Sequence, residues 1–254
     1  MLISNDPAAW RSARVIKNLA RKKTPAQQTF SGIRAAVAAA PLNEIMPAAP
    51  GDHAAALGFS LAWALMASAG GVIFWAAPER DFFEDGLPNA EGLAQFGVSL
   101  DRLLLVRANS QIDALWATEQ ALATPGTIAL CAISPDKKTM SLTATRRLLL
   151  AAEKHKTQCI LLRLDQAGAS AAWSRWRVNT APGQGMAREL DAPSFTAHLI
   201  RNRAGPSGLS FNLQWNIHDH ALHITEGRPD AAMDGTVSAA SADRPADAQR
   251  HNAA

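Results

Sequence analysis

The fold is decided between residues 72 and 164, where four short apolar runs read VIFW (72–75), LLLV (103–106), IALCAI (128–133) and CILLRL (159–164). Near-continuous apolar runs of this length are typical of strands that helices cover on both faces. The segments between them carry helical patterns at Ala90–Phe96, Ser110–Ala123 and Thr143–His155. Strands that alternate with helices predict crossover connections, and therefore a parallel sheet.

The same alternation begins upstream, with a strand expected at Leu42–Met46 and a helix rich in small residues at His53–Ala69. After Ala171 only strand patterns follow, at Trp173–Val178, Phe195–Arg203, Leu209–Asn216 and Ala221–Thr225. The string RAGPSG (203–208) predicts a turn between two of these strands. We therefore predict one α/β domain over residues 30–226, with a mostly parallel sheet flanked by helices and antiparallel strands at its C-terminal end.

The two ends of the chain differ from this domain in charge and composition. Asp6-Pro7 predicts the start of a helix that runs to about Arg21, with Ile16 and Leu19 on its apolar face. Residues 6–23 hold six Lys or Arg against one acid. TPAQQ (24–28) has the composition of a linker, so residues 1–29 are interpreted as a basic helix and linker. Residues 227–254 have few large apolar side chains, which predicts a disordered tail.

Composition excludes several classes of protein. The chain has 254 residues, of which 48% are hydrophobic and 19% charged, enough for one sizeable core. The longest apolar run, Ala54–Ala69, falls short of a membrane span, and no signal-peptide pattern is found, so we expect a cytoplasmic protein. Cys131 and Cys159 are expected to be small hydrophobes on neighbouring strands of a reduced protein.

The order of these elements and several local strings resemble the RecA-type core and, more closely, the ImuA family of inducible mutagenesis proteins. The resemblance covers roughly Leu42 to Ile224. It rests on the following strings, taken in order: VIFW (72–75), GVSLDRLLLV (97–106), ALWATEQAL (114–122), LTATRRL (142–148), RWRV (175–178) and LIRNRAGPSG (199–208). The resemblance implies a RecA-like core.

A RecA-type ATPase needs a glycine-rich phosphate loop after its first strand, with a lysine and a hydroxyl at the end of the loop. The matching segment here is PAAPGDHA (47–54), in which Pro47 replaces the first glycine and Gly51 is followed by Asp52 and His53. A carboxylate at that point repels a triphosphate by about 4 kcal/mol at 4 Å and an effective dielectric of about 20. RecA-type ATPases also need an aspartate, the Walker B residue, after an apolar strand. The matching position here, at the end of IALCAI (128–133), is Ile133. We therefore expect no ATP hydrolysis and no cofactor, although Glu79 with His53 leaves residual nucleotidase activity as an alternative.

Three further groups of residues are candidate contacts. The loop that follows residue 134 is short but contains Lys137 and Lys138, which are basic enough for weak contact with single-stranded DNA. The string WSRWR (173–177) interleaves aromatic and basic side chains, a pattern that stacks on single-stranded bases and here offers Trp173, Arg175 and Arg177. Strand alternation leaves open that one tryptophan belongs to the core.

The hairpin at residues 201–208 resembles the one whose basic residues, in RecA-like proteins, reach toward a neighbouring subunit. Arg201 and Arg203 are therefore candidates for a partner interface, together with Trp10, Ile16 and Leu19 of the N-terminal helix. The alternative is that both arginines face solvent on an ordinary strand.

Two polar clusters are given structural interpretations. HDHALH (218–223) has a metal-like composition but lacks remote ligands, so we expect a polar hairpin turn and no metal site. Glu79, Asp81, Glu84 and Asp85 are interpreted as part of a surface loop.

The ImuA resemblance implies a non-catalytic adaptor in damage-induced translesion synthesis. Its implied partners are RecA, an ImuB-type homologue of Y-family polymerases and an error-prone C-family polymerase, with nucleoid association after DNA damage. The alternative is a SulA-like inhibitor that binds the division GTPase.

Overall fold

A computed structural model describes residues 25–68, 70–134, 141–164, 168–182 and 192–225. Its elements, in chain order, are α2 (Pro25–Ala38), β1 (Leu42–Pro47), η1 (Pro50–Asp52), α3 (His53–Ser68), β2 (Val72–Pro78), α4 (Glu79–Asp85), α5 (Ala90–Phe96), η2 (Leu100–Arg102), β3 (Leu103–Ala108), α6 (Gln111–Ala121), β4 (Thr127–Ile133), α7 (Leu142–His155), β5 (Gln158–Arg163), β6 (Ser174–Thr180), β7 (Ser194–Asn202), β8 (Leu209–Asn216) and β9 (Ala221–Ile224).

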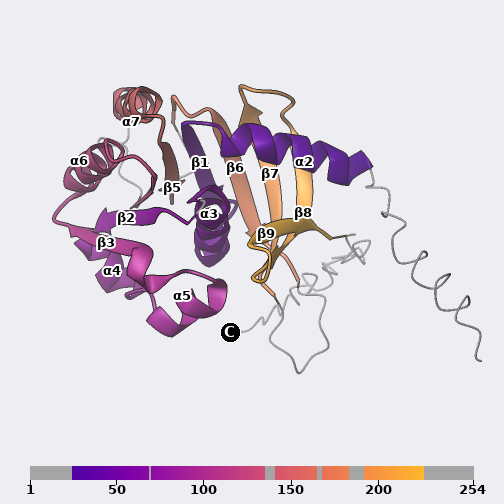
Figure 1. Cartoon of the computed structure of the whole chain (residues 1–254), viewed down its shortest axis with the longest axis horizontal. Coiled ribbons are helices and arrows are strands. Elements are labelled where there is room, and N and C mark those ends of the chain that lie inside the picture. The colour runs from indigo at the N-terminus through magenta and orange to yellow at the C-terminus, as the bar shows by residue number, and fades with distance from the viewer. Residues whose placement is uncertain (1–24, 69, 135–140, 165–167, 183–191, 226–254) are drawn as a thin grey trace, which may run out of the picture.

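The strands form one sheet in the order β3-β2-β4-β5-β1-β6-β7-β8-β9. All pairs from β3 to β6 are parallel, and all pairs from β6 to β9 are antiparallel. The predicted change from a parallel to an antiparallel sheet is confirmed, and each expected strand is found within a few residues of its predicted bounds. Figure 1 shows α6 and α7 on one side of the parallel half, away from α3, α4 and α5.

Two apolar clusters occupy the two faces of the sheet. The larger one joins α2, α3 and α5 to the sheet, and at its centre the rings of Phe59, Trp63 and Phe211 lie around Trp176. The smaller one lies under α6 and α7. It holds Cys131 and Cys159 on the adjacent strands β4 and β5, as expected. Burial raises the pKa of Cys131 to about 12 and that of Cys159 well above its usual value, so both thiols stay protonated at neutral pH.

The ends of the helices follow from local sequence. The side-chain oxygens of Ser110, Asn89 and Ser141 accept hydrogen bonds from backbone N–H groups in the first turns of α6, α5 and α7. Between α3 and β2 the chain passes so close to the carbonyl of Gly126 that a Cβ on Gly71 would lie 2.1 Å from that oxygen. Only glycine fits this crossing.

Two expectations about secondary structure are wrong. Residues 25–28, interpreted as a linker, are the first turn of α2, whose Phe30, Ile33 and Val37 are buried against the sheet. Residues 79–85, interpreted as a surface loop, form α4.

The LLLV run is not covered on both faces, because β3 is the edge of the sheet and the side chain of Leu104 is 53% exposed. An edge strand can carry the same apolar residues as a central strand. An apolar run alone therefore does not distinguish the two positions in a sheet.

The N-terminal helix candidate and the C-terminal tail lie outside the described residues. Among the helices that the structure describes, none is long and apolar enough to span a bilayer.

Candidate functional site

Residues 47–54, which the resemblance to RecA-type proteins matches to a phosphate loop, are bound to β6 by the side chain of Asp52. Its Oδ2 accepts hydrogen bonds from the N–H of Ala49 at 3.1 Å and from Nδ2 of Asn179 at 3.3 Å. Its Oδ1 accepts one from the N–H of Thr180 at 2.9 Å. Because Asp52 directly precedes α3, its negative charge also lies near the positive end of that helix, an end that favours anions. The chain thus supplies its own anion at this end of α3.

The other residues of this segment are integrated into the same structure. Pro47 ends β1 opposite Val178 of β6, and the N–H of Ala48 donates to the carbonyl of Val178 at 2.9 Å. Gly51 lies exposed in η1, and the half-buried His53 begins α3. These contacts hold the segment against β6.

We expect Asp52→Ala to lower the free energy of unfolding by about 1–2 kcal/mol, because the N–H of Thr180 and the amide of Asn179 lose a charged acceptor. Asp52→Asn should lose less, since its amide oxygen can still accept. Urea unfolding followed by circular dichroism measures both variants. The exposed Asp219, in the β8–β9 turn, is the matched control, and Asp219→Ala should leave the stability nearly unchanged. Equal effects at the two sites would show that Asp52 does not hold the loop.

Glu79 does not join His53 in a common site. It is the first residue of α4, and its Oε1 lies 3.5 Å from Nη1 of Arg107 on the edge strand β3. Both side chains of this pair are about half exposed. The geometry therefore places Glu79 in a surface ion pair, whereas His53 lines the cavity described below.

A buried acid that sequence reasoning missed lies at the centre of the sheet. Glu44 of β1 is fully buried, and its Oε1 lies 3.3 Å from Nη1 of Arg163 on β5 and 3.0 Å from Nη2 of Arg175 on β6. Arg163 is 1% exposed and Arg175 is 18% exposed. Glu44 thus joins the three strands where the parallel half meets the antiparallel half. A single acid within an apolar strand, LNEIM (42–46), was the available signal.

The WSRWR segment (173–177) divides between core and surface. Trp176 is completely buried in the larger cluster, which confirms that one tryptophan belongs to the core. Trp173 and Arg177 are half-buried, and the guanidinium of Arg175 is engaged by Glu44. Of the DNA-contact candidates in this segment, Trp173 and Arg177 are partly exposed at the surface.

The two arginines of the β7–β8 hairpin differ in their surroundings. Nη1 of Arg201 donates to the carbonyl of Ser170 at 3.0 Å, and this side chain is half-buried. Arg203 is exposed at the start of the turn. The turn itself is held by a hydrogen bond from the N–H of Gly208, at φ +74°, to the carbonyl of Leu199 at 2.7 Å. Arg203 is therefore the member of the pair that a partner can reach.

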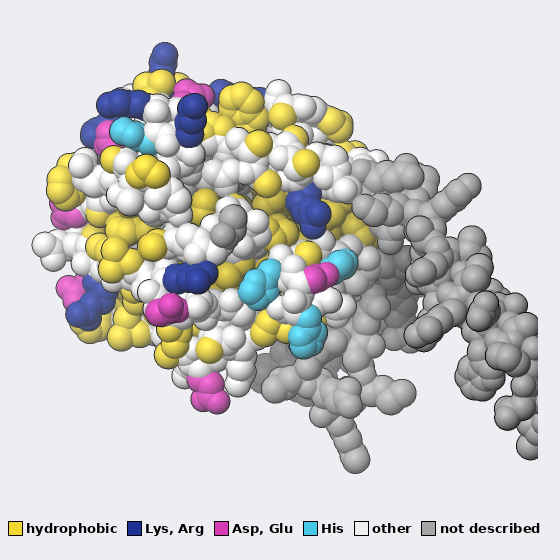
Figure 2. Space-filling view, viewed as in Figure 1, with side chains coloured by type: hydrophobic (Ala, Val, Ile, Leu, Met, Phe, Trp, Pro, Cys, Tyr) yellow, Lys and Arg dark blue, Asp and Glu magenta, His cyan; other side chains and the backbone are white. Residues whose placement is uncertain are grey.

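The polar hairpin turn predicted for residues 218–223 is found between β8 and β9 at residues 217–220, and Ala221 already begins β9. Figure 2 shows histidine side chains gathered there beside an acidic one. Nε2 of His223 lies 2.6 Å from Oδ2 of Asp219, and the ring of His220 stacks on Trp215. Within the described residues, no group of three or more metal-ligating side chains converges. Trp10, Ile16, Leu19, Lys137 and Lys138 lie outside the part of the chain that the structure describes.

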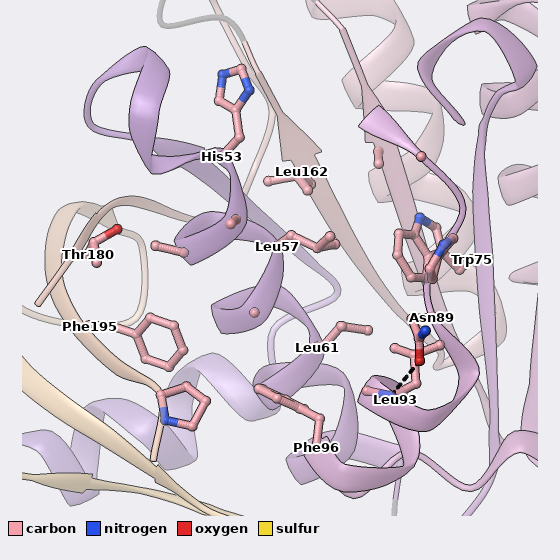
Figure 3. A pocket seen from close by; sticks show the side chains of 18 of the residues that line it. His53, Leu57, Leu61, Trp75, Asn89, Leu93, Phe96, Leu162, Thr180 and Phe195 are labelled. Carbon is pink, nitrogen blue, oxygen red and sulfur yellow. Dashed lines mark hydrogen bonds between the residues drawn. The ribbon is translucent and has the colours of Figure 1, made fainter. Parts of the chain in front are cut away.

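An apolar cavity of about 840 Å³ lies beside α3. Figure 3 shows Leu57 and Leu61 of α3 between two walls, one with Thr180 and Phe195 and the other with Trp75 and Leu93, and with His53 and Phe96 at opposite ends. Sequence reasoning did not find this cavity, because the described residues that line it come from eight separate elements and the loops between them.

The described residues define an α/β fold with one nine-stranded sheet, in which the side chain of Asp52 binds residues 47–54 to β6. No family model matches the chain. It is similar to Protein ImuA from two strains of Caulobacter vibrioides, with 32% identity over 167 residues, which are 61% of this chain and 64% of the relative. The chain thus matches just under two thirds of the length of these relatives. This homology confirms the resemblance to the ImuA family.

Among solved structures, the chain is similar to SulA from Pseudomonas aeruginosa, with a TM-score of 0.37 and 21% identity. That alignment covers 49% of this chain and 98% of SulA.

Proposed function

We propose that this protein is a non-catalytic accessory protein in damage-induced mutagenesis, where it bridges RecA and an error-prone polymerase assembly. The observation that carries the proposal is the homology to Protein ImuA. The resemblance to that family implies action in translesion synthesis with an ImuB-type subunit and a C-family polymerase.

The geometry of the phosphate-loop segment supports a role without ATP hydrolysis. The carboxylate of Asp52 accepts hydrogen bonds from the N–H of Ala49 within the loop and from the N–H of Thr180 in β6. The loop ends in Asp52, His53 and Ala54, without the lysine and hydroxyl that bind phosphate and magnesium. A nucleotide phosphate placed there would meet a fixed carboxylate instead of a cation. We therefore expect titration calorimetry to detect no magnesium-dependent binding of ATP.

The exposed Arg203 is the proposed contact with an intact partner ATPase. An exposed arginine at a turn can donate to carboxylates or phosphates of a neighbouring subunit, whereas Arg201 is held by the carbonyl of Ser170. The N-terminal residues Trp10, Ile16 and Leu19 are the second proposed contact, and Trp173, Arg177, Lys137 and Lys138 are proposed for weak binding of single-stranded DNA.

We expect Arg203→Glu to reduce capture of RecA by the tagged protein at least tenfold, because charge reversal converts an attraction into a repulsion. The measurement is a pull-down from DNA-damaged cells, probed for RecA and the polymerase subunits. Arg80→Glu is the matched control, since the Arg80 side chain is 81% exposed on the distant helix α4.

Two results would contradict the proposal. Unchanged capture by Arg203→Glu would remove the hairpin from the interface. Absence of RecA and polymerase subunits from the wild-type pull-down, together with filamentous cells on overproduction, would favour inhibition of cell division instead.

A further inference from the structure

The antiparallel half of the sheet has one apolar, covered face and one polar face. Figure 1 shows α2 crossing β6, β7 and β8, and the ring of Phe30 on α2 lies 5.1 Å from that of Phe211 on β8. On the other face, the side chains that alternate with the buried ones are half-buried or exposed, as at Arg177, His198 and Ser210. Strands β6 to β9 contain no Asp or Glu, and their ionisable side chains are arginine and histidine. This polar side is called the open face below.

Arg177 is the residue of the open face that points to a ligand. Its side chain is half-buried, and its guanidinium forms no ion pair or hydrogen bond with the described residues. The Nε atom is buried, whereas the two terminal nitrogens are accessible. A guanidinium keeps its charge in a protein, and partial burial of an unpaired charge is unfavourable. An anion bound at the terminal nitrogens would therefore be favoured.

His198 and Ser210 extend this position across the sheet. His198 of β7 lies directly opposite Arg177, and Ser210 of β8 lies directly opposite His198, so the three side chains share one face. Nδ1 of His198 lies 2.6 Å from Oγ of Ser210. The row spans two strand spacings, roughly 10 Å, which is wider than a single phosphate group.

The acids on neighbouring elements leave this row positive. Glu44 is fully buried between Arg163 and Arg175, where two guanidinium groups face one carboxylate. Asp52 lies beyond the row, at the end of β6, and its carboxylate already accepts hydrogen bonds from that strand. Neither acid is paired with Arg177.

From these observations we infer that the row of Arg177, His198 and Ser210 binds phosphates of a single-stranded nucleic acid that lies on the open face. The phosphates supply the anions that Arg177 lacks, and a flat sheet face can hold a single strand, as it does in RNA-recognition modules. The inference rests on the proposed function and deepens it, because it names the surface that holds the single-stranded DNA.

The test follows the fluorescence anisotropy of labelled oligothymidylate during titration with the full-length protein. We expect saturable binding, which Arg177→Gln should weaken about tenfold, the worth of one charge-assisted hydrogen bond. The same variant should reduce the slope of log affinity against log salt by about 0.7, the value for one phosphate contact on a single strand. A purely structural role of Arg177 would leave this slope unchanged. Arg34→Gln is the matched control, because Arg34 lies on α2 and α2 covers the opposite face of the same strands.

A second variant keeps the test valid if circular dichroism shows that Arg177→Gln does not fold. Asn212 is exposed on β8, two residues from Ser210 and on the same face. Asn212→Glu adds a like charge beside the bound phosphates and should weaken binding about fivefold. Gln120→Glu, at an exposed position on α6, is its control and should leave binding unchanged.

Three results would overturn the inference: no saturable binding of oligothymidylate, equal affinity and equal salt slope for Arg177→Gln and Arg34→Gln, or competition by polyglutamate or inorganic phosphate as strong as by unlabelled oligothymidylate. The last would assign the open face to an acidic protein or to a free anion. Capture of RecA is measured separately and should not change in Arg177→Gln, so failure of this site and failure of the bridging role are distinguishable.

Discussion

Glu44→Ala is expected to lower the free energy of unfolding by about 3–5 kcal/mol, because it removes a fully buried carboxylate from its ion pairs with the guanidinium groups of Arg163 and Arg175. Arg163 is 1% exposed and lies 3.3 Å from Glu44, so the lost ion pair is a buried one that solvent screens little. The same change frees Arg175, which Glu44 holds at 3.0 Å. Equilibrium unfolding in urea, followed by circular dichroism, measures the loss.

An exposed ion pair provides the control for Glu44. Glu119 and Arg147 connect α6 to α7, and their side chains are 26% and 62% exposed. Glu119→Ala should cost no more than about 1 kcal/mol, since solvent screens such pairs. In the double variant Glu44→Ala/Arg175→Ala the loss should be smaller than the sum of the two single losses. A loss below about 1 kcal/mol for Glu44→Ala would refute the structural role assigned to the buried acid.

Trp176→Ala is expected to lower the free energy of unfolding by about 3–5 kcal/mol, the range for truncation of a large aromatic side chain in a core. Trp176 is completely buried, and its ring centroid lies 5.6 Å from that of Phe59 and 5.9 Å from that of Trp63. Its indole N–H also donates to the hydroxyl of Ser174 at 3.2 Å. The cavity left behind would adjoin β6, α3 and β8 together, which few side-chain movements can fill.

Trp116 on α6 is the matched control for Trp176, because its side chain is 59% exposed. Trp116→Ala should change the stability by no more than about 0.5 kcal/mol. Thermal and urea unfolding of both variants give the comparison. Similar losses in the two variants would mean that Trp176 contributes little to the stability of the core.

Most of the strands and helices could be predicted, because hydrophobic periodicity is a local property of the chain. The expected helix at His53–Ala69 corresponds to α3, and the expected strand at Ile128–Ile133 corresponds to β4. Helix α2 was missed since Pro25 and the two glutamines that follow are also typical of linkers. The spacing of Phe30, Ile33 and Val37 on one helical face was the signal that could have revealed it.

The candidate site could be predicted only where single residues decide the chemistry. Asp52 stands where a phosphate-binding loop needs a different residue, and its presence alone argues against triphosphate binding. That Asp52 instead accepts hydrogen bonds from Asn179 and Thr180 required the tertiary structure, since these residues lie 127 and 128 positions away in the chain. The hydrogen bond that holds Arg201 likewise required the tertiary structure, since Ser170 lies 31 positions away in the chain.

The sequence by itself determined the order of strands and helices and the change from parallel to antiparallel pairing, because each depends on neighbours along the chain. It also predicts that residues 47–54 do not suit a triphosphate. The tertiary structure alone decided that β3 is an edge, that Glu44 meets Arg163 and Arg175, and that eight elements line a cavity beside α3. The contacts of Glu44 join segments more than a hundred residues apart, and no local pattern of side chains records which distant segment will face which.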